Sequence, residues 1–491
     1  MDRAPWLAAG LAIGLGLVAA ALYVLLRQDT THQYDIYWML PKLRDGLTHY
    51  PRHPLVFPIL DALVSMLDGW GSLHERFKIA NGLCTGAAVA IFTHAAYVLR
   101  ANLRQAALVG ITFALLPTTV RFATLAELHG VFLPFAAIAI WQACRMVKAP
   151  IAYRPLQGFV LGLLTAIAAG VHGTGHLLVG VTGLLLVISW WHCEPIAQRA
   201  LGLRKLIATV VTLVATHAIA SKLLTISITA PVDAQWQVIA HEAHTLDGVF
   251  ATIAGELLWP LLPVSFLWPL ALLQKPRTLA AVFALSLPAY LVTCQLLLCA
   301  PTLGYTFHEN GAYLEPIAFF AVLIAVRLLG ARWALWLPVL ALAAAVYWHH
   351  YPERESPDRS FGTTATSYLG SHDVRLIVAG FAEWDGAFEV LIENPELDAR
   401  RSNMMLLEQL ILETKTHSAV NANQLALYFH PNVAGKPTVL TTKALADMRA
   451  AGGVFADCVE NVMPKLYEFE EVRYAPDGGA ILTGVQLIPR L

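Results

Sequence analysis

The sequence predicts a polytopic α-helical membrane protein that carries a small α/β domain at its C-terminal end. Three observations support this fold class. Hydrophobic residues make up 57% of the 491 positions and charged residues only 14%, whereas an average soluble domain has about 25% charged residues. Long apolar runs recur up to about residue 350. Beyond that point the composition becomes polar, so we expect a membrane domain over 1–350 and a water-soluble domain over 351–491.

Apolar runs of about 20 residues are long enough to cross a bilayer, and they give about eleven predicted spans. The first run, Leu7 to Leu26, has no clear small-residue cleavage site, so we expect a retained helix rather than a signal peptide. Several later runs are short or contain proline, which predicts tilted or kinked helices. The predicted spans are 7–26, 77–99, 105–120, 127–147, 156–171, 174–192, 203–223, 247–272, 279–300, 313–330 and 333–348.

Positive charge orients these spans in the membrane. With a cytoplasmic N-terminus, each predicted cytoplasmic loop carries or adjoins basic residues, beginning with Arg100 and Arg104. The later outer loops, 224–246 and 301–312, contain no Lys or Arg. This asymmetry follows the positive-inside rule. An odd number of spans then places the C-terminal domain outside the cytoplasm, in a periplasm or lumen.

The first outer loop, residues 27–76, has helical periodicity. Its apolar residues predict an amphipathic helix at the membrane interface, which Pro41 kinks or splits. A second interfacial helix is predicted after His53, with Pro54 in its first turn. The apolar stripe of the first helix consists of Ile36, Met39, Leu40, Leu43 and Leu47.

The C-terminal segment alternates strand-like and helix-like runs, which predicts a small α/β domain. The Asp-Gly-Gly sequence at 477–479 fits a hairpin turn. The strand-like runs are Val374–Ala379, Thr438–Thr441 and Ala480–Ile488, and the helix-like runs are Met404–Glu413 and Lys443–Ala451.

Overall charge and cysteine content exclude two classes of function. The net charge of −1 lacks the basic excess of nucleic-acid-binding proteins, so no nucleic acid partner is expected. The six cysteines form no CxxC pair, and all but Cys458 lie in or beside apolar runs. We therefore expect neither a disulfide framework nor a zinc site, and we interpret the cysteines as small apolar core residues.

Ionisable residues recur at span ends that the predicted topology places on the outer side. Because such groups are costly near lipid, their recurrence on one side predicts a cavity that opens outward. They are His32, Asp35, His49, His53, Arg121, Glu127, His129, His172, His176, His241, Glu242, His244, His308, Glu309 and Glu315.

Several of these residues have a structural alternative. Asp35 and Glu127 are suitable caps for helices. His172 and His176 would share a face if their segment is helical, and a metal pair is then an alternative, although no third ligand is apparent. The histidines of 241–244 are three residues apart and so do not match the HExxH zinc motif, which favours a solvated loop.

Three stretches of the sequence together resemble the GT-C superfamily of integral-membrane glycosyltransferases, and locally its protein O-mannosyltransferase-like branch. The first combines Tyr34-Asp35 with residues 53–58 (HPLVFP). The second is residues 124–129 (TLAELH), which resembles an alanine-glutamate at the start of the fourth span. The third is residues 170–176 (GVHGTGH), which resembles a glycine-histidine segment between the fifth and sixth spans. The resemblance covers about the first 330 residues.

The resemblance implies an enzyme that transfers a sugar from a polyprenyl-phosphate donor to an acceptor hydroxyl at the outer face, with inversion at the anomeric carbon. Asp35 is the implied base, and Glu127 orients the acceptor or shares that role. Arg121 is the candidate partner of the phosphate, because a guanidinium binds phosphate oxygens in a bidentate way. Its alternative is an interfacial residue that snorkels. The remaining candidates for substrate binding are His53, His172, His176, His308 and Glu309.

The expected partners are the polyprenyl-phosphate sugar and the lipid bilayer, while the acceptor stays open. No cofactor is expected, because a lone acid in the first loop offers a divalent metal few ligands. A transporter or flippase is the main alternative. The sequence shows no paired broken helices in two symmetric halves, and its polar residues gather at one face. A membrane scaffold that displays its outer domain is a third hypothesis.

Overall fold

The computed structural model describes residues 4–28, 34–46, 53–99, 101–147, 153–193, 199–226, 253–273, 278–291, 311–349, 358–393, 403–407, 421–476 and 480–490. The chain divides into two compact units. The first comprises Met1–Gln28, Lys42–Pro301 and Thr306–Tyr351, and the second comprises Asp29–Pro41, Thr302–Tyr305 and Pro352–Leu491.

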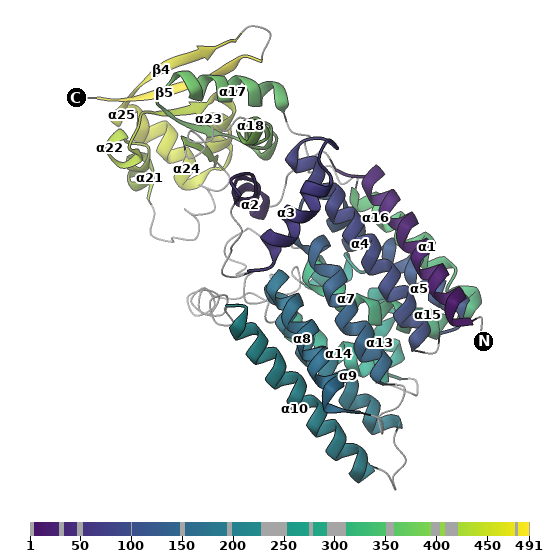
Figure 1. Ribbon diagram of the computed structural model, residues 1–491. Helices are drawn as coiled ribbons and strands as arrows, with labels where there is room; N and C mark the ends of the chain where they lie inside the picture. Colours follow the sequence, from purple (N-terminus) through teal and green to yellow (C-terminus); the bar gives the residue numbers. More distant parts are fainter. Residues whose placement is uncertain are drawn as a thin grey trace. The chain divides into compact units, whose positions relative to one another are not determined.

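The first unit is an α-helical bundle (Figure 1). Within the described residues, six helices are long and apolar enough to cross a membrane, or seven if one bent pair counts as a single span. The principal helices are α1 (Ala4–Leu25), α3 (Val56–Met66), α4 (Leu73–Val98), α5 (Leu103–Ala114), α6 (Pro117–Thr124), α7 (Leu128–Met146), α8 (Pro155–Val171), α9 (Leu177–Cys193), α10 (Arg199–Leu223), α14 (Thr278–Leu291), α15 (Glu315–Trp333) and α16 (Trp336–His349).

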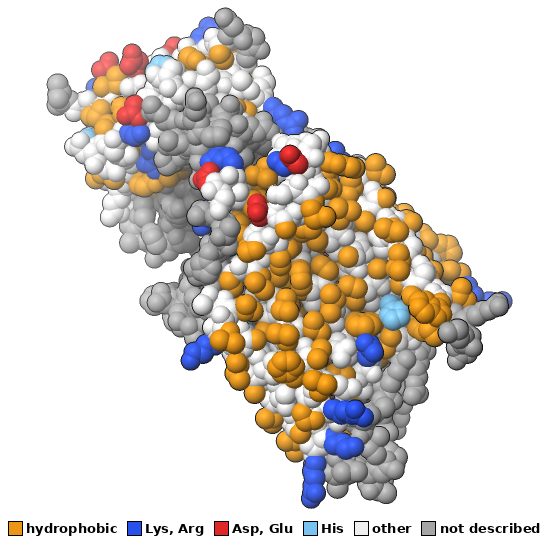
Figure 2. Space-filling view, viewed as in Figure 1, with side chains coloured by type: hydrophobic (Ala, Val, Ile, Leu, Met, Phe, Trp, Pro, Cys, Tyr) orange, Lys and Arg blue, Asp and Glu red, His pale blue; other side chains and the backbone are white. Residues whose placement is uncertain are grey.

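The surface of this bundle is apolar, as expected for a multi-pass membrane protein. Large side chains of α10 such as Ile207, Val211 and Ile219 are exposed. Figure 2 shows hydrophobic side chains spread over the bundle, with Lys and Arg side chains toward the end where α10 begins. A soluble protein seldom exposes so large a contiguous apolar area, so lipid must cover it. The chain is therefore a multi-pass membrane protein.

Two predicted spans differ from the structure. Residues 105–120 were expected as one span, but α5 and α6 meet at a bend of 59°. Pro117 begins α6, because proline suits the first turn of a helix and cannot donate a hydrogen bond within the preceding one. The part of span 247–272 that is described is also broken, into a π-helical segment (Ala254–Leu258), a 3₁₀ turn (Val264–Phe266) and the short helix α13 (Trp268–Ala271). The count of eleven spans stays a prediction.

Small residues allow close helix contacts in the bundle. A Cβ added at Gly158 of α8 would lie 2.2 Å from the Thr209 carbonyl oxygen of α10, and one at Gly162 would lie 2.6 Å from the Leu213 carbonyl oxygen. These glycines are four residues apart and share a helix face. The arrangement is the small-residue packing typical of membrane helices, whose backbones approach closely.

Two helices were predicted in the first loop, and both form. α2 (Tyr34–Arg44) contains Pro41. α3 begins at Val56, two residues after Pro54. The chain before α3 is tied to the bundle, because the Leu55 backbone N–H donates to the Gly170 carbonyl oxygen at 2.9 Å.

The C-terminal part of the second unit is an α/β domain built on a five-stranded sheet of order β2-β1-β3-β5-β4. β1 lies between β2 and β3 and is parallel to both, whereas β5 is antiparallel to β3 and to β4. The strands are β1 (Arg375–Val378), β2 (Met404–Leu406), β3 (Thr438–Thr441), β4 (Tyr467–Tyr474) and β5 (Leu482–Pro489). Its principal helices are α17 (Arg359–Ser371), α18 (Phe381–Glu393), α21 (Ala422–Tyr428), α22 (Pro431–Ala434), α23 (Thr442–Ala450), α24 (Gly453–Asp457) and α25 (Met463–Leu466).

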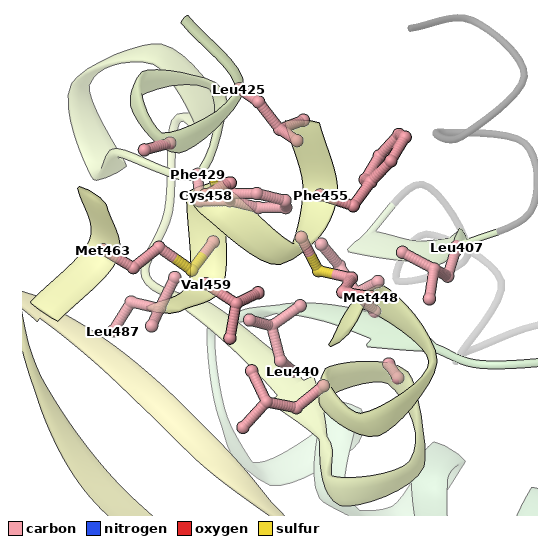
Figure 3. Packing of buried hydrophobic residues seen from close by; sticks show 14 of the residues in the cluster. Leu407, Leu425, Phe429, Leu440, Met448, Phe455, Cys458, Val459, Met463 and Leu487 are labelled. Carbon is pink, nitrogen blue, oxygen red and sulfur yellow. The ribbon is translucent and has the colours of Figure 1, made fainter. Parts of the chain in front are cut away.

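Helices cover both faces of this sheet. Strand residues alternate between its two sides, so a single strand contributes apolar side chains to the core on each face. Leu376 and Val378 of β1 pack with α17 and α18, whereas Ile377 packs into a second core with α21 and α23. Figure 3 shows this second core, to which Phe429, Leu440 and Cys458 belong. Burial raises the pKa of the Cys458 thiol to about 12.

The strand-like runs at 374–379, 438–441 and 480–488 correspond to β1, β3 and β5, and residues 442–450 form the helix α23. Residues 404–406, expected to be helical, instead form β2. This strand pairs with β1, so a tertiary contact overrides a local periodicity that cannot separate short buried helices from strands. β4 was not predicted, and the turn at 477–479 between β4 and β5 lies outside the described residues.

Candidate functional site

The turn between α6 and α7 positions Glu127 and His129. The side chain of Glu127 caps α7 by accepting a hydrogen bond from the Leu128 N–H at 2.8 Å. Asn81 of α4 holds the same turn, because its Nδ2 donates to the carbonyl oxygens of Leu125 and Glu127, both at 2.6 Å. Glu127 was interpreted either as a helix cap or as a catalytic residue. This geometry shows that it caps α7, and its share in catalysis stays a prediction.

The chain between α8 and α9 positions His172. This residue ends α8 with an extended backbone (φ −150°, ψ 135°), and a 3₁₀ turn over Gly173–His176 follows. Its Nδ1 atom lies 2.7 Å from the Thr174 Oγ1 and 3.4 Å from the Thr174 N–H nitrogen. The turn packs tightly on α8, since a Cβ at Gly175 would lie 2.3 Å from the Ala169 nitrogen.

Three histidines from distant parts of the chain meet at the end of the bundle where α8 ends and α7 begins. The rings of His53 and His172 stack with centroids 5.0 Å apart and planes 12° apart. The His129 ring lies 4.7 Å from that of His172. Tyr313, which lies just before α15, contacts both, at 5.0 Å from His129 and 5.7 Å from His172. We name His53, His129, His172 and Tyr313 the histidine cluster.

Arg121 reaches the histidine cluster through an aromatic neighbour. Its guanidinium carbon lies 5.7 Å from the centre of the Phe122 ring. That ring meets His129 edge-on at a centroid distance of 5.4 Å. The last turn of α6 therefore brings one cation to the edge of the cluster.

A second carboxyl group follows Tyr313 in the chain. Glu315, at the start of α15, is only 1% exposed and lies beside Thr119 of α6. Its Oε1 atom has no hydrogen-bond partner within the described residues. A carboxyl group buried in a membrane domain is expensive to keep and commonly functional, so Glu315 belongs to the candidate site.

A buried cation near the same end was missed at the sequence level. The Nζ of Lys78 in α4 donates to the Gln28 carbonyl oxygen and to Glu75 Oε1, both at 2.7 Å. Glu75 Oε2 also accepts from Arg27 Nε at 2.5 Å. The signal that could have revealed Lys78 is the pair Glu75 and Lys78, three residues apart at the start of an apolar span.

His172 and His176 do not share a helical face. Their segment is extended and then 3₁₀-helical, so His172 joins the histidine cluster while His176 bonds elsewhere. The His176 Nδ1 lies 2.8 Å from Nε2 of His217 in α10. The alternative of a metal pair at these two positions has no geometric support. Within the described chain, no group of three or more His, Cys, Asp or Glu side chains could hold a metal ion.

Asp35 lies in α2, and its side chain is outside the described structure. His308 and Glu309 are also outside the described residues, as are His241, Glu242 and His244. The structure thus brings together His53, His129, His172 and Tyr313, with Arg121 at the edge. His176 pairs with His217 of α10 instead.

Comparison with known proteins supports the fold. No protein-family model and no curated protein sequence matches the chain. The solved structure of ArnT from Cupriavidus metallidurans, bound to undecaprenyl phosphate, matches with a TM-score of 0.55 over 99% of this chain and 98% of that one, at 14% sequence identity. The chain has the GT-C fold. Arabinosyltransferase EmbB from Mycobacterium smegmatis matches with a TM-score of 0.40 at 12% identity, over 96% of this chain and 45% of that one.

This fold agrees with the one that the motif resemblance implies. Two of those motifs lie in the histidine cluster, since residues 124–129 supply His129 and residues 170–176 supply His172. Part of the first motif is there as well, through His53. The mannosyltransferase-like branch stays a prediction.

Proposed function

We propose that this chain is a membrane glycosyltransferase that moves a sugar from a polyprenyl-phosphate donor to an acceptor hydroxyl at the outer face. The observation that carries the proposal is the histidine cluster, in which segments around residues 53, 129, 172 and 313 converge at one end of a GT-C bundle. Four distant segments seldom place such polar rings together inside a membrane domain without a ligand to bind. The neighbour ArnT, whose structure holds undecaprenyl phosphate, supports a donor of this class.

The donor needs a partner for its phosphate and room for its sugar. In this proposal Arg121 contacts the phosphate, because a guanidinium presents a fork of donors to phosphate oxygens. His172 contributes its ring to the sugar site, with its Nδ1 held by Thr174. The rings of His53 and His129 line the site beside His172.

The acceptor hydroxyl needs a base as it attacks the anomeric carbon. We assign this role to Asp35, as the resemblance implies, with Glu127 in a supporting position. The attacking oxygen forms a bond to the anomeric carbon while the bond to the phosphate oxygen breaks. The proton passes to Asp35, the polyprenyl phosphate leaves as the anion, and the sugar configuration inverts.

The test is transfer of a radiolabelled sugar from a panel of polyprenyl-phosphate sugars in proteoliposomes. Asp35→Asn should lower transfer by at least about 100-fold, in line with general-base catalysis, while the variant still binds donor. Asp61→Asn is the matched control, because Asp61 is exposed on α3. A transporter or scaffold would tolerate both substitutions equally, so equal activity of the two variants would contradict the proposal.

A further inference from the structure

Asn81 of α4 holds the turn between α6 and α7 at two backbone positions. It is 0% exposed, and its Nδ2 donates to the carbonyl oxygens of Leu125 and Glu127, both at 2.6 Å. Both partners are acceptors only, so the amide must present its NH₂ group to them. The amide also packs on the first turn of α7, since a Cβ added at Gly130 would lie 2.9 Å from its Cγ and Oδ1 atoms.

Lys78 holds the same region through the chain that follows α1. It lies three residues before Asn81, so the two side chains share a face of α4. Its Nζ donates to the Gln28 carbonyl oxygen and to Glu75 Oε1, both at 2.7 Å. The Gln28 backbone N–H donates to the Thr124 carbonyl oxygen at 3.0 Å, and the Gln28 Nε2 donates to Thr124 Oγ1 at 2.8 Å. The last residue of α6 is thus tied through Gln28 to α4.

Thr124 passes this restraint to the turn that carries Arg121. The Thr124 Oγ1 lies 2.8 Å from the Val120 carbonyl oxygen and 3.1 Å from the Arg121 carbonyl oxygen. Its single proton is donated to this pair of oxygens, which leaves its lone pairs to accept from Gln28. The backbone of Arg121 is therefore bonded directly to the residue that Gln28 holds.

We name Lys78, Asn81, Gln28 and Thr124 the polar bracket. All four are buried, with at most 8% of their surface exposed. Polar groups inside a membrane domain are costly and are commonly kept for function. Their hydrogen bonds converge on the backbone of one short stretch at the end of α6. A backbone held at several points keeps the side chain that it carries close to one geometry, as a precise binding site requires.

We infer that the polar bracket holds the last turn of α6 so that Arg121 meets the phosphate of the donor. The inference rests on the proposed function, since the phosphate contact of Arg121 is part of it. The four members are positioning residues, because each acts through the backbone of α6 and not through a contact with the donor.

Binding of undecaprenyl phosphate to the full-length protein in nanodiscs tests the inference. Thr124→Val removes the hydroxyl and keeps the shape of the side chain, and Asn81→Leu removes the amide at similar volume. Each should weaken binding about three- to ten-fold, the range for lost hydrogen bonds, and Thr124→Ser should restore most of the affinity. Thr85→Val is the matched control. Thr85 lies on the same helix and is 1% exposed, and its Oγ1 has no hydrogen-bond partner within the described residues.

A double-mutant cycle with Arg121→Gln separates positioning from general damage to the bundle. Arg121→Gln should weaken binding by itself, and Thr124→Val should then add less than about two-fold, because the group that it positions is gone. A merely structural role predicts the same loss with and without Arg121, so additive losses would overturn the inference. Normal binding by Arg121→Gln would overturn it as well, since no phosphate contact would be left to position.

Transfer kinetics give a second measurement. Thr124→Val should raise the KM for the donor by about the same factor as it weakens binding and change kcat by less than about two-fold, because it weakens a binding contact and leaves the base untouched. A fall in kcat at unchanged KM would contradict the inference. Failure of the wild type to bind undecaprenyl phosphate would overturn both proposals, whereas additive losses in the double-mutant cycle would leave the proposed function in place.

Discussion

The two units of this protein differ in the side chains that they expose and in the polar residues that they enclose. The helical bundle exposes large apolar residues such as Ile207 and Leu223 and encloses polar ones such as Lys78 and Asn81. The C-terminal domain places apolar residues such as Phe429 and Leu440 in its interior and charged residues of β4 outside. Lipid and water as surrounding solvents account for the difference. Polar side chains in the bundle interior are therefore the better guide to function.

Two buried cysteines allow the units to be followed separately in the full-length protein. Cys144 lies in the bundle and Cys458 in the C-terminal core, and both are 0% exposed. Maleimide labelling during a temperature ramp, followed by peptide mass spectrometry, reports when each thiol becomes accessible. The four predictions below use this measurement.

The largest effect is expected from Phe429→Ala, which empties part of the C-terminal core. Truncating a buried phenylalanine costs about 4 kcal/mol of unfolding free energy. Cys458 should be labelled at a markedly lower temperature while Cys144 is unchanged. Leu427→Ala, at an exposed position of α21, is the matched control. A parallel shift of both cysteines would show that the units unfold together, against the division proposed here.

Lys78→Met tests the ion pair of the bundle in which the lysine is buried. Glu75 is 25% exposed and keeps Arg27 as a partner, so removing the cation should cost about 2 kcal/mol and advance labelling of Cys144. Lys436→Met removes a pair of similar length in the C-terminal domain, where Lys436 and Asp373 are 2.6 Å apart and partly exposed. That control should cost less than about 1 kcal/mol, because exposed pairs are screened by solvent. Similar losses of unfolding free energy for the two variants would contradict the expected difference between the two ion pairs.

Gly158→Ala tests the close contact of α8 with α10. The added methyl group would lie 2.2 Å from the Thr209 carbonyl oxygen, so the helices must separate at a cost of about 2 kcal/mol. Gly180→Ala makes the same substitution where a Cβ meets nothing within 4 Å. Cys144 labelling should come earlier in the first variant only. Equal behaviour would mean that the small-residue contact contributes little.

Glu383→Gln should have the smallest effect, and its sign depends on pH. Burial raises the pKa of Glu383 above its ordinary value of 4.5, so the folded domain binds more protons than the unfolded one. Its stability therefore falls as pH rises through the folded pKa. The glutamine variant should delay labelling of Cys458 near pH 7 and lose this advantage below about pH 4. Glu468→Gln, at an exposed position of β4, is the matched control. A gain for Glu383→Gln that persists in acid would disprove the explanation.

Helix positions and one cap, that of Glu127 on α7, followed from the local sequence. Apolar runs predicted α1, α4, α7, α9 and α10 to within a few residues, because burial in lipid requires long uninterrupted apolar stretches. Alternation predicted β1, β3 and β5 in the same way. The prediction of a helix at residues 404–406 was wrong. Three residues hold too little periodicity to identify a strand, and pairing with β1 determined the structure.

The candidate site was predicted in part. His53, Arg121 and His172 were named from the sequence because polar residues at span ends are rare and costly. Lys78, His217 and Tyr313 were not. The spacing of Lys78 from Glu75 was a weak signal that was missed, whereas a single histidine or tyrosine in or beside an apolar run leaves no pattern. His172 and His176 also illustrate the limit, because four-residue spacing predicts a shared face only when the backbone is helical.

The sequence by itself determined that this chain enters a membrane, where most of its helices lie and that a small α/β domain follows them. Hydrophobic periodicity carries that information, since it reports which solvent each face meets. Only the tertiary structure decided that the rings of His53, His129 and His172 lie together and that His176 pairs with His217. Such contacts join residues far apart in the chain, so they depend on where the packing of the helices places each helix end in space.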